Sequence, residues 1–308
     1  MKYLKNTNVS ITSAQQQQQQ QQHQLVEEEA EETNDCQSNC GETRQREYSI
    51  CSSIGEQTDE EQYSNHLDEM IKNLLLKREN KTCSDCGSPD PVYASIYYKV
   101  IICSGCAVIH RKCLKSKVQS INLSNEWSLD EYQSFSNTNN MIENESWEKY
   151  LPLSYIKPTF GDSSLLKENW ILTKYIHQSF TSEKNLSKLK MDLTEGWIVK
   201  KGKVVKNWKK RWLRLCQVGD KKKLNYYRGP TETTACGSID LCQDGGAIQI
   251  DCINDNGKRT NCFVICTSKR RYLISCPSQE EMFRWIQLIR SSTNYYNQFK
   301  NIPQQITI

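Results

Sequence analysis

Four cysteines arranged as two CxxC pairs form the strongest chemical pattern in the sequence. Sixteen residues separate the pairs, whose members are Cys83, Cys86, Cys103 and Cys106. Each CxxC turn can direct two thiolates at one point, and two such turns complete the tetrahedral sulfur set that Zn²⁺ prefers. Four protein ligands leave no position for water, so the pattern predicts one structural zinc ion. Redox chemistry is the less favoured interpretation, because redox proteins normally use a single CxxC motif. His110 and Cys113 are close enough in sequence to be alternative zinc ligands, but the two CxxC pairs already supply four.

A second pattern is a dense run of cations between residues 200 and 228, which hold twelve Lys or Arg and one acid, Asp220. In an extended strand, Lys209 and Arg211 point to one face of the sheet and the residues between and beside them to the other. With Lys200 on a neighbouring strand, they can form a cup for adjacent phosphates, in which Arg gives bidentate contacts. Nucleic acid is the less favoured ligand, because no exposed series of stacking aromatics accompanies this charge.

The net charge of +4 combines an acidic N-terminal segment with a basic remainder of the chain. Residues 1–66 carry twelve acids and four bases, a net −8, so the remainder carries +12. The same segment includes eight consecutive glutamines, from Gln15 to Gln22, and few aromatic or branched residues. It cannot bury enough apolar area to offset the entropy of ordering, so we expect residues 1–60 to form a disordered tail.

Targeting signals and membrane spans are absent from the sequence pattern. No run of 18 or more uncharged apolar residues occurs, and the first residues have no apolar stretch of the secretory type. The pattern predicts an intracellular protein. Fifteen cysteines in a reducing compartment do not form a disulfide framework, so those outside the two pairs are expected mainly to pack as small apolar residues.

Hydrophobic periodicity predicts the elements that position these residues. A helical stripe runs from Leu67 to Leu75, a capping box begins at Ser128, and a further helix over 165–176 presents Leu165, Leu172 and Ile176 on one face. From Glu195 the pattern changes to seven short β-type runs separated by turn residues. One helix follows, opening with a capping box at Ser278 and presenting an apolar side made of Met282, Trp285, Ile286 and Ile289.

Residues around the cysteines resemble the Arf GAP zinc-finger family, which accelerates GTP hydrolysis on Arf-type small GTPases. The resemblance rests on the arrangement CxxC-x16-CxxC-x4-Arg, in which Arg111 is the arginine, and on Asp90-Pro91-Val92-Tyr93-Ala94-Ser95 between the pairs. It continues through Ser116 to Ser120, Asn140 to Glu148, Lys157-Pro158 and Lys167 to Tyr175, and so spans about residues 67 to 180. This resemblance implies an α+β zinc-finger domain over residues 61–185.

The resemblance also implies a catalytic role for Arg111. A guanidinium inserted beside the transferring phosphoryl group stabilises the charge of the transition state with planar, permanently protonated donors. Such arginine fingers contribute about 10³ to 10⁵ in rate in other GTPase systems. The chain would then be a GTPase activator that completes the active site of its partner, and not a stand-alone enzyme.

The β-rich segment resembles a pleckstrin homology (PH) domain. The resemblance rests on Glu195-Gly-Trp-Ile-Val-Lys200, Asn207-Trp-Lys-Lys-Arg-Trp212, Leu224-x-Tyr226-Tyr227 and the closing helix with Trp285. It implies a mainly-β domain over residues 194–293, a seven-stranded curved sheet with a C-terminal helix, followed by a tail over 294–308. It also implies that Lys200, Lys209, Arg211 and Tyr227 bind the inositol phosphate headgroup of a membrane lipid.

These expectations combine into a multidomain chain: a disordered arm, a zinc-finger Arf GAP domain and a PH domain, in the order of the centaurin-α subgroup. The expected partners are a GTP-bound Arf-family GTPase and phosphoinositides, with no nucleic acid, in a cytoplasmic protein recruited peripherally to membranes for vesicle trafficking. Two alternatives stay open. One is a non-catalytic phosphoinositide-binding adaptor, since the loop after Arg111 is about two residues shorter than the family's; the other is a GATA-like zinc-finger DNA binder.

Overall fold

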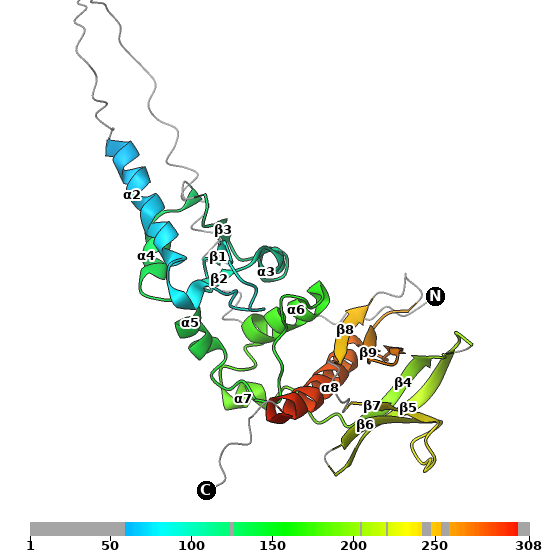
Figure 1. The fold of residues 1–308 in the computed structure, drawn as a ribbon. Coiled ribbons are helices and arrows are strands. Elements are labelled where there is room, and N and C mark those ends of the chain that lie inside the picture. Colours follow the sequence, from blue (N-terminus) through cyan, green and yellow to red (C-terminus); the bar gives the residue numbers. More distant parts are fainter. Residues whose placement is uncertain are drawn as a thin grey trace, which may run out of the picture. The chain divides into compact units, whose positions relative to one another are not determined.

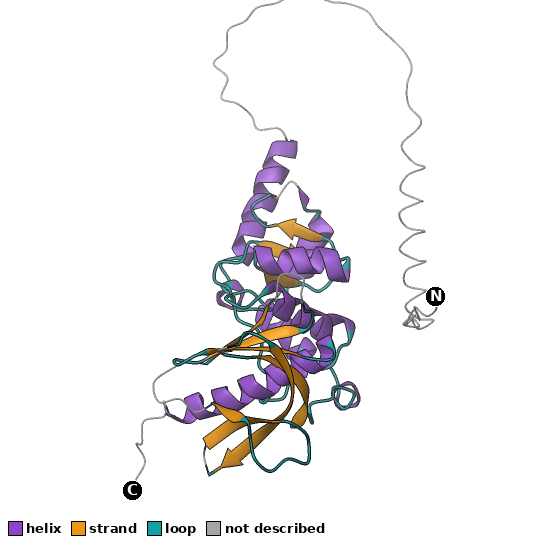
Figure 2. Cartoon of the chain, turned by 90° about the vertical axis from the view of Figure 1, so that its right-hand side faces the viewer, coloured by secondary structure: helices purple, strands orange, loops and turns teal. Residues whose placement is uncertain are grey.

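The computed structural model describes residues 59–300, apart from 124–125, 204, 220, 242–247 and 254–258 (Figures 1 and 2). Of the tail expected over residues 1–60, residues 1–58 lie outside this described part, and residues 59–60 begin helix α2. No helix in the described ranges has both the length and the apolar character needed to cross a bilayer.

The cysteine-rich region consists of short helices around a small antiparallel sheet (Figure 1). The three strands lie in the order β2-β1-β3, and β1 pairs with both neighbours over its full length. The elements are α2 (Asp59–Leu74), η1 (Arg78–Asn80), β1 (Tyr93–Ser95), β2 (Val100–Ile102), α3 (Ser104–Ile109), η2 (His110–Leu114), β3 (Val118–Ser120), α4 (Leu129–Ser136), α5 (Asn140–Trp147), α6 (Ser164–Ile171), η4 (Leu172–Ile176) and α7 (Glu183–Leu186).

The predicted helix signals at the start of this region are confirmed. Leu67, Ile71 and Leu74 of α2 are buried, as one face of an amphipathic helix should be. Ser128 caps α4: its hydroxyl accepts from the backbone N–H of Glu131, whose carboxylate accepts from the N–H of Ser128. This reciprocal pair satisfies two of the donors that a helix start leaves without intrahelical partners.

The helix over 165–176 forms, but the prediction of its buried face was wrong. It is built from α6 and the wider turn η4, and it buries Leu166, Trp170, Ile171 and Tyr175 while Ile176 is 45% exposed. Trp170 stacks on Phe180 with ring centroids 5.4 Å apart. The large aromatic side chains remove more apolar area from water than the three aliphatic residues of the expected stripe, and they decide the orientation of the helix.

The second region is a seven-stranded antiparallel sheet closed by one long helix, as the sequence predicted. The strands are β4 (Glu195–Lys201), β5 (Trp208–Val218), β6 (Lys221–Tyr227), β7 (Gly237–Asp240), β8 (Gln249–Ile253), β9 (Cys262–Cys266) and β10 (Arg271–Ser275), and the helix is α8 (Gln279–Lys300). Their order in the sheet is β7-β6-β5-β4-β10-β9-β8. Strands β7 and β8 follow one another in the chain but lie at opposite edges, so the sheet must curve to bring them within reach of a short connection.

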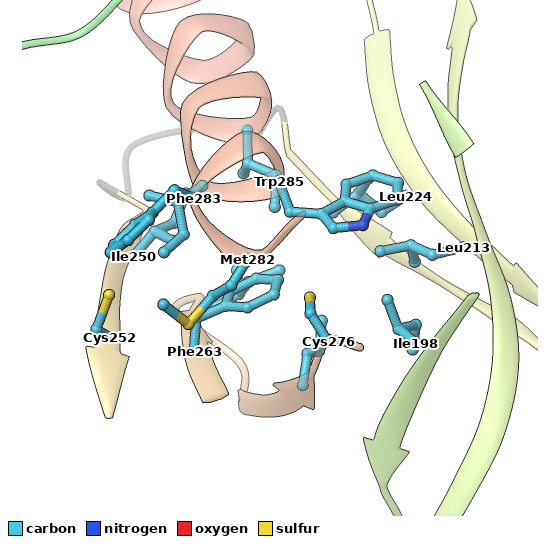
Figure 3. Close-up of a cluster of buried hydrophobic side chains, with 14 of the residues drawn as sticks. Ile198, Leu213, Leu224, Ile250, Cys252, Phe263, Cys276, Met282, Phe283 and Trp285 are labelled. Atoms are coloured by element: carbon cyan, nitrogen blue, oxygen red, sulfur yellow. The ribbon is translucent and has the colours of Figure 1, made fainter. Parts of the chain in front are cut away.

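The inner face of this sheet and one side of α8 form a single hydrophobic core (Figure 3). Met282, Trp285, Ile286 and Ile289 are all fully buried, which confirms the predicted apolar side of the helix. Ser278 accepts a hydrogen bond from the N–H of Glu281 at the helix start. The helix runs on to Lys300, so part of the segment expected as a tail over 294–308 is helical; residues 301–308 are outside the described residues.

Candidate functional site

The two CxxC pairs meet at one point in the structure. The sulfur atoms of Cys83, Cys86, Cys103 and Cys106 all lie within 4.8 Å of one another. A tetrahedral zinc ion with Zn–S bonds of about 2.3 Å holds its sulfurs about 3.8 Å apart. The Sγ atoms of Cys86 and Cys103 are 3.6 Å apart, and three of the four cysteines are buried. The cluster therefore fits a closed metal site with four thiolate ligands.

Local backbone structure directs each pair of thiols inward. The N–H of Gly87 donates to the carbonyl of Cys83 at 3.0 Å, and the N–H of Cys83 donates to the carbonyl of Ser88 at 2.8 Å, which closes the first turn. Gly87 has φ of +66°, a left-handed conformation that glycine adopts at low cost. Cys103 immediately precedes α3 and Cys106 lies in its first turn. The second pair is therefore held by a helix start.

His110 is not a metal ligand in this arrangement. Its ring is fully buried, with Nε2 3.0 Å from Oδ2 of Asp85 and Nδ1 2.9 Å from the hydroxyl of Ser95. Asp85 lies between the first two cysteines and Ser95 ends strand β1. His110 thus ties the first cysteine turn and the small sheet to the helical turn that carries Arg111.

A buried ion network around Asp85 is linked to the same turn through His110. The ammonium of Lys174 is 3.4 Å from Asp85 and 2.9 Å from Glu148, and it donates to Oδ1 of Asn144 at 2.7 Å. The hydroxyl of Tyr175 donates to Asp85 at 2.9 Å. Burial opposes the ionisation of Asp85, but Lys174, His110 and Tyr175 outweigh it and hold the pKa of this carboxyl below its usual range.

Arg111 lies at the surface, one residue beyond the buried histidine. Its guanidinium donates to the carbonyl of Val118 in β3 at 2.9 Å, and its central carbon is 5.3 Å from the centre of the Tyr93 ring in β1. Tyr93 therefore supplies an aromatic wall for the arginine. The turn η2 ends at Leu114; the next residue, Lys115, has φ of +54°, and β3 begins at Val118.

The basic residues of the sheet converge as the strand pattern predicted. Lys200 pairs with Lys209 across β4 and β5, and Ile198 pairs with Arg211, so the three cations lie on one face. Lys200 is only 6% exposed. Burial, followed by the charges of Arg270 and Arg211, lowers the pKa of Lys200 to about 8. Such crowding of cations is favourable for binding an anion between them.

Tyr227 does not join these cations. It pairs with Trp212 on the opposite face of the sheet, where it is buried beneath the guanidinium of Arg214. Tyr226 lies instead beside the ammonium of Lys200, which is 4.6 Å from the centre of its ring. Because side chains alternate between faces along a strand, a shift of one residue decides which of two adjacent tyrosines lines the site.

Arg270 and Tyr272 are site residues that the sequence analysis missed. The ammonium of Lys200 is 5.4 Å from the centre of the Tyr272 ring, and the guanidinium of Arg270 is 4.6 Å from the same ring. Arg270 immediately precedes β10 and Tyr272 is the second residue of this strand, which pairs with β4 only in the folded sheet. The sequence does contain the run Arg270-Arg271-Tyr272 at the start of a β-type segment. Its proximity to Lys200 could be recognised only with knowledge that β10 pairs with β4.

The other cysteines in the described residues show no second metal cluster of three or more ligands. Cys252, Cys262 and Cys276 are buried in the sheet region, as expected for small apolar residues, whereas Cys236 is exposed. Burial raises the pKa of the Cys252 thiol to about 12, which keeps it protonated and unreactive near neutral pH.

Comparisons with known proteins agree with this division of the chain. The ArfGap family profile, described as "Putative GTPase activating protein for Arf", matches residues 68–184, and the PH domain profile matches residues 193–294. The solved "ArfGap domain of HIV-1 Rev binding protein" superposes with a TM-score of 0.38 at 14% identity, over 43% of this chain and 99% of that one.

Two curated relatives match the cysteine-rich part of the chain. An Arabidopsis thaliana protein named "ADP-ribosylation factor GTPase-activating protein AGD12" is 37% identical over 113 residues, which are 36% of this chain and 33% of the relative. "Arf-GAP with dual PH domain-containing protein 2" of Rattus norvegicus is 36% identical over 109 residues, 35% of this chain and 29% of the relative. The chain thus spans about a third of the length of each relative. From these matches and the two folds, the chain contains an ArfGap domain followed by a PH domain.

Proposed function

We propose that this protein accelerates GTP hydrolysis on a GTP-bound Arf-family GTPase. The observation that carries the proposal is the placement of Arg111: an exposed arginine on a turn fixed by the four-cysteine cluster and the buried His110. Relatives of the ArfGap part of the chain are named as GTPase-activating proteins for ADP-ribosylation factor. In this role, Arg111 enters the partner's active site and stabilises the charge that develops on the transferring phosphoryl oxygens.

The four-cysteine cluster would hold one Zn²⁺ ion with a structural role. Its four thiolates fill the coordination shell, so the ion supplies crosslinking and no open site for water. Cys83 and Cys86 precede the small sheet, whereas Cys106 lies in α3, immediately before the turn with Arg111. The metal therefore fixes the base from which Arg111 reaches its target.

The PH domain would recruit this activity to membranes through phosphoinositides. Lys200, Lys209 and Arg211 lie on one face of adjacent strands, and Arg270 lies close enough to Lys200 to lower its pKa. Arginine side chains of this kind make bidentate contacts to phosphate, and lysine contributes point charge. Tyr226 and Tyr272 form the apolar walls of the cup around the Lys200 ammonium.

A single-turnover assay of GTP hydrolysis tests the catalytic proposal. The wild-type protein is added to Arf loaded with GTP on phosphoinositide vesicles and compared with Arg111→Lys, which keeps the charge and loses the planar fork. We expect the substitution to remove most of a rate increase of about 10³ to 10⁵. Lys112→Ala, on the same turn, is the matched control and should retain the wild-type rate. Equal rates for wild type and Arg111→Lys would exclude the arginine-finger role.

A non-catalytic adaptor is the second candidate, and one observation favours it. The guanidinium of Arg111 is engaged by the Val118 carbonyl, and the segment between them is short and turns at Lys115 with φ of +54°. If this contact holds the arginine back, the protein binds Arf or phosphoinositides without raising the hydrolysis rate at any protein concentration. DNA binding is the third candidate, and retention on DNA but not on phosphoinositide vesicles at physiological salt would support it.

A further inference from the structure

The chain segment between α5 and α6 lies against helix α8 of the PH domain. The side-chain amide of Gln287, in α8, holds the backbone of Ile156 with two hydrogen bonds: Oε1 accepts from the N–H at 2.9 Å, and Nε2 donates to the carbonyl at 3.1 Å. An amide side chain that accepts and donates at one residue fixes both the position and the direction of that backbone. This contact joins the ArfGap domain to the PH domain across 131 positions of the sequence.

An ion pair lies about one helical turn further along α8. Both terminal nitrogens of Arg290 donate to the carboxylate of Asp162, Nη1 at 3.0 Å and Nη2 at 2.5 Å. Nη2 also donates to the carbonyl of Ile250 in β8 at 2.9 Å. The side chains of Arg290 and Asp162 are only 12% and 13% exposed. A bidentate pair shielded from water in this way is directional, unlike most ion pairs at a protein surface.

Helix α6 belongs to the hydrophobic cores of both domains. Leu166, near its start, is buried in the cluster formed by the PH sheet and α8. Trp170 and Ile171, at its end, are buried in the cluster that includes three of the paired cysteines. The backbone N–H of Ser163, immediately before the helix, donates to Oδ2 of Asp251 in β8 at 3.1 Å. A helix of eight residues therefore bridges two packed cores.

These contacts leave little freedom between the two domains. Domains of one chain move relative to one another unless an interface holds them. Here the interface combines directional hydrogen bonds with a shared helix, and packed interiors deform little. The covalent connection from α7 to β4, residues 187–194, is described in full and contains no helix or strand. The angle between the domains is therefore set by α6 and by the interdomain contact, in which Gln287 holds Ile156 and Arg290 holds Asp162.

The same helix also reaches the turn that carries Arg111. Its continuation η4 provides Tyr175, whose hydroxyl donates to Asp85 at 2.9 Å. Asp85 lies 3.0 Å from the buried ring of His110, and Arg111 is the next residue. A continuous series of packed and hydrogen-bonded groups thus runs from α8 to the turn with Arg111. The position of this turn is fixed relative to the phosphate cup of the PH domain.

This fixed geometry has its effect when the GTPase and the PH domain are bound to one bilayer. Lipid in the cup then determines how the PH domain lies on the membrane, and the interdomain contact carries that orientation to Arg111. Misplacement of a catalytic group by about 1 Å can cost about 100-fold in rate. A GTPase free in solution can turn to meet Arg111, so its reaction does not depend on the angle between the domains.

We propose that Asp162, Gln287 and Arg290 are positioning residues, which hold the ArfGap domain at a fixed angle to the PH domain so that lipid binding directs Arg111 toward a membrane-bound GTPase. The PH domain then provides orientation as well as recruitment. This inference rests on the proposed GTPase-activating function. It predicts a difference that recruitment alone does not give: loss of the interdomain contact slows the reaction at a membrane and spares the reaction in solution.

Single-turnover GTP hydrolysis with the full chain tests this role. The GTPase is either tethered to phosphoinositide vesicles or free in solution without vesicles, and both forms are loaded with GTP. The variant D162A/Q287A removes the interdomain contact. It leaves Arg290 with the Ile250 carbonyl of its own domain, so the PH core keeps its own contacts.

The matched control D192A/Q279A removes the same residue types from exposed positions. Asp192 pairs with Arg284 of α8 but is 89% exposed, and Gln279 is an exposed residue at the start of α8. Two further measurements accompany the rates. Affinity for a soluble inositol polyphosphate reports on the cup, and nuclear magnetic relaxation of the backbone amides reports the rotational correlation time of each domain.

We expect D162A/Q287A to lower the rate with the tethered GTPase about tenfold to 100-fold. The rate with the free GTPase and the affinity for inositol polyphosphate should not change. The two domains should share one correlation time in the wild type and have different times in D162A/Q287A. The control D192A/Q279A should match the wild type, because an exposed pair contributes little. Gln287→Ala alone should give the same pattern with a smaller loss, and an unchanged unfolding midpoint separates this loss from misfolding.

Three outcomes overturn the proposal. Equal rates for wild type and D162A/Q287A with the tethered GTPase exclude a positioning role. An equal loss with the tethered and the free GTPase would show that these residues maintain the ArfGap fold instead, and different correlation times in the wild type would show that the domains are not held together. Failure of the proposed function looks different: the wild type then accelerates neither form of the GTPase, while the correlation times still report whether the interdomain contact holds.

Discussion

The guanidinium carbon of Arg111 lies 5.3 Å from the centre of the Tyr93 ring, while its Nη2 donates to the carbonyl of Val118 at 2.9 Å. The arginine is thus held between two strands of the small sheet before any partner is bound. Its side chain has lost part of the rotamer freedom that a surface arginine normally keeps, and less remains to be lost on binding.

Removing the Tyr93 ring should slow GTP hydrolysis more than it weakens binding of the GTPase. We expect Tyr93→Ala to lower the single-turnover rate about twofold to fivefold, the equivalent of an exposed cation–π contact of about 0.5–1 kcal/mol. Tyr93→Phe keeps the ring and should retain the rate. Saturating protein concentrations separate the rate from the affinity, and a loss of affinity alone would show that Tyr93 contacts the partner instead.

Metal analysis should find one zinc ion per chain, bound by the four clustered thiols. Chelation or Cys106→Ser should unfold the ArfGap region, since Cys83, Cys86 and Cys106 are part of its buried cluster. The hydrophobic core of the sheet contains none of these ligands. Phosphoinositide binding by the PH domain should therefore survive metal loss. Retention of the full helical circular dichroism signal after chelation would contradict a structural metal.

Breaking the buried ion network should be strongly destabilising. Lys174 is fully buried and contacts Asp85 and Glu148, so Lys174→Met removes the buried positive charge shared by both carboxylates and should lower the free energy of unfolding by about 3–5 kcal/mol. Lys157 contacts the same Glu148 but is 36% exposed. Lys157→Met should therefore lower the free energy of unfolding by no more than about 1 kcal/mol. Denaturant titration measures the free energy of unfolding of both variants. Equal decreases for the two variants would show that the burial of the lysine does not determine the loss of stability.

Phosphoinositide binding should weaken as the pH rises through 8. Burial and the neighbouring arginines lower the pKa of Lys200 to about 8 from the ordinary value of 10.5. Above pH 8 the free domain loses this positive charge and attracts phosphate less strongly. The same shift has the opposite effect on folding: between pH 8 and 10.5 the unfolded chain holds a proton that the folded chain does not, so this group makes stability rise with pH.

Vesicle binding at pH 7 and pH 9 measures this dependence. Lys200→Arg stays charged throughout and should abolish the part of the pH dependence that Lys200 contributes. Lys209 lies on the same face but at an exposed position, so Lys209→Ala should retain the pH dependence that Lys200 contributes. A wild-type affinity that does not change between the two pH values would show that Lys200 does not contact the headgroup.

The elements of the fold follow largely from local patterns. The capping box at Ser128, the buried face of α2 and the seven strands are all set by residues close together in the chain, and each was predicted. The helix over 165–176 was predicted as an element but with the wrong buried face. Which side of it is buried depends on partners such as Phe180 and Tyr155, whose aromatic rings pack near Trp170 only in the tertiary structure.

The candidate sites likewise depend partly on local patterns and partly on tertiary structure. The grouping of the four cysteines could be predicted from spacing, because a CxxC turn is a local structure, and the folded chain brings the two turns together. The cup was assigned only in part: alternation placed Lys209 and Arg211 together, but the pairing of β10 with β4 brings Tyr272 and Arg270 to Lys200. Such pairing joins residues about seventy positions apart, and no local pattern encodes it.

The sequence by itself determined two cysteine pairs with the spacing of metal ligands, a basic hairpin and two domains of different periodicity, because these depend on the types and spacing of nearby residues. The tertiary structure alone decided that Tyr226 and not Tyr227 lies beside Lys200, that Lys174 is buried against Asp85, and that Arg111 rests on Tyr93. Each of these depends on the register of a strand or the rotation of a helix. A shift of one residue would reverse it, and long-range packing fixes that choice.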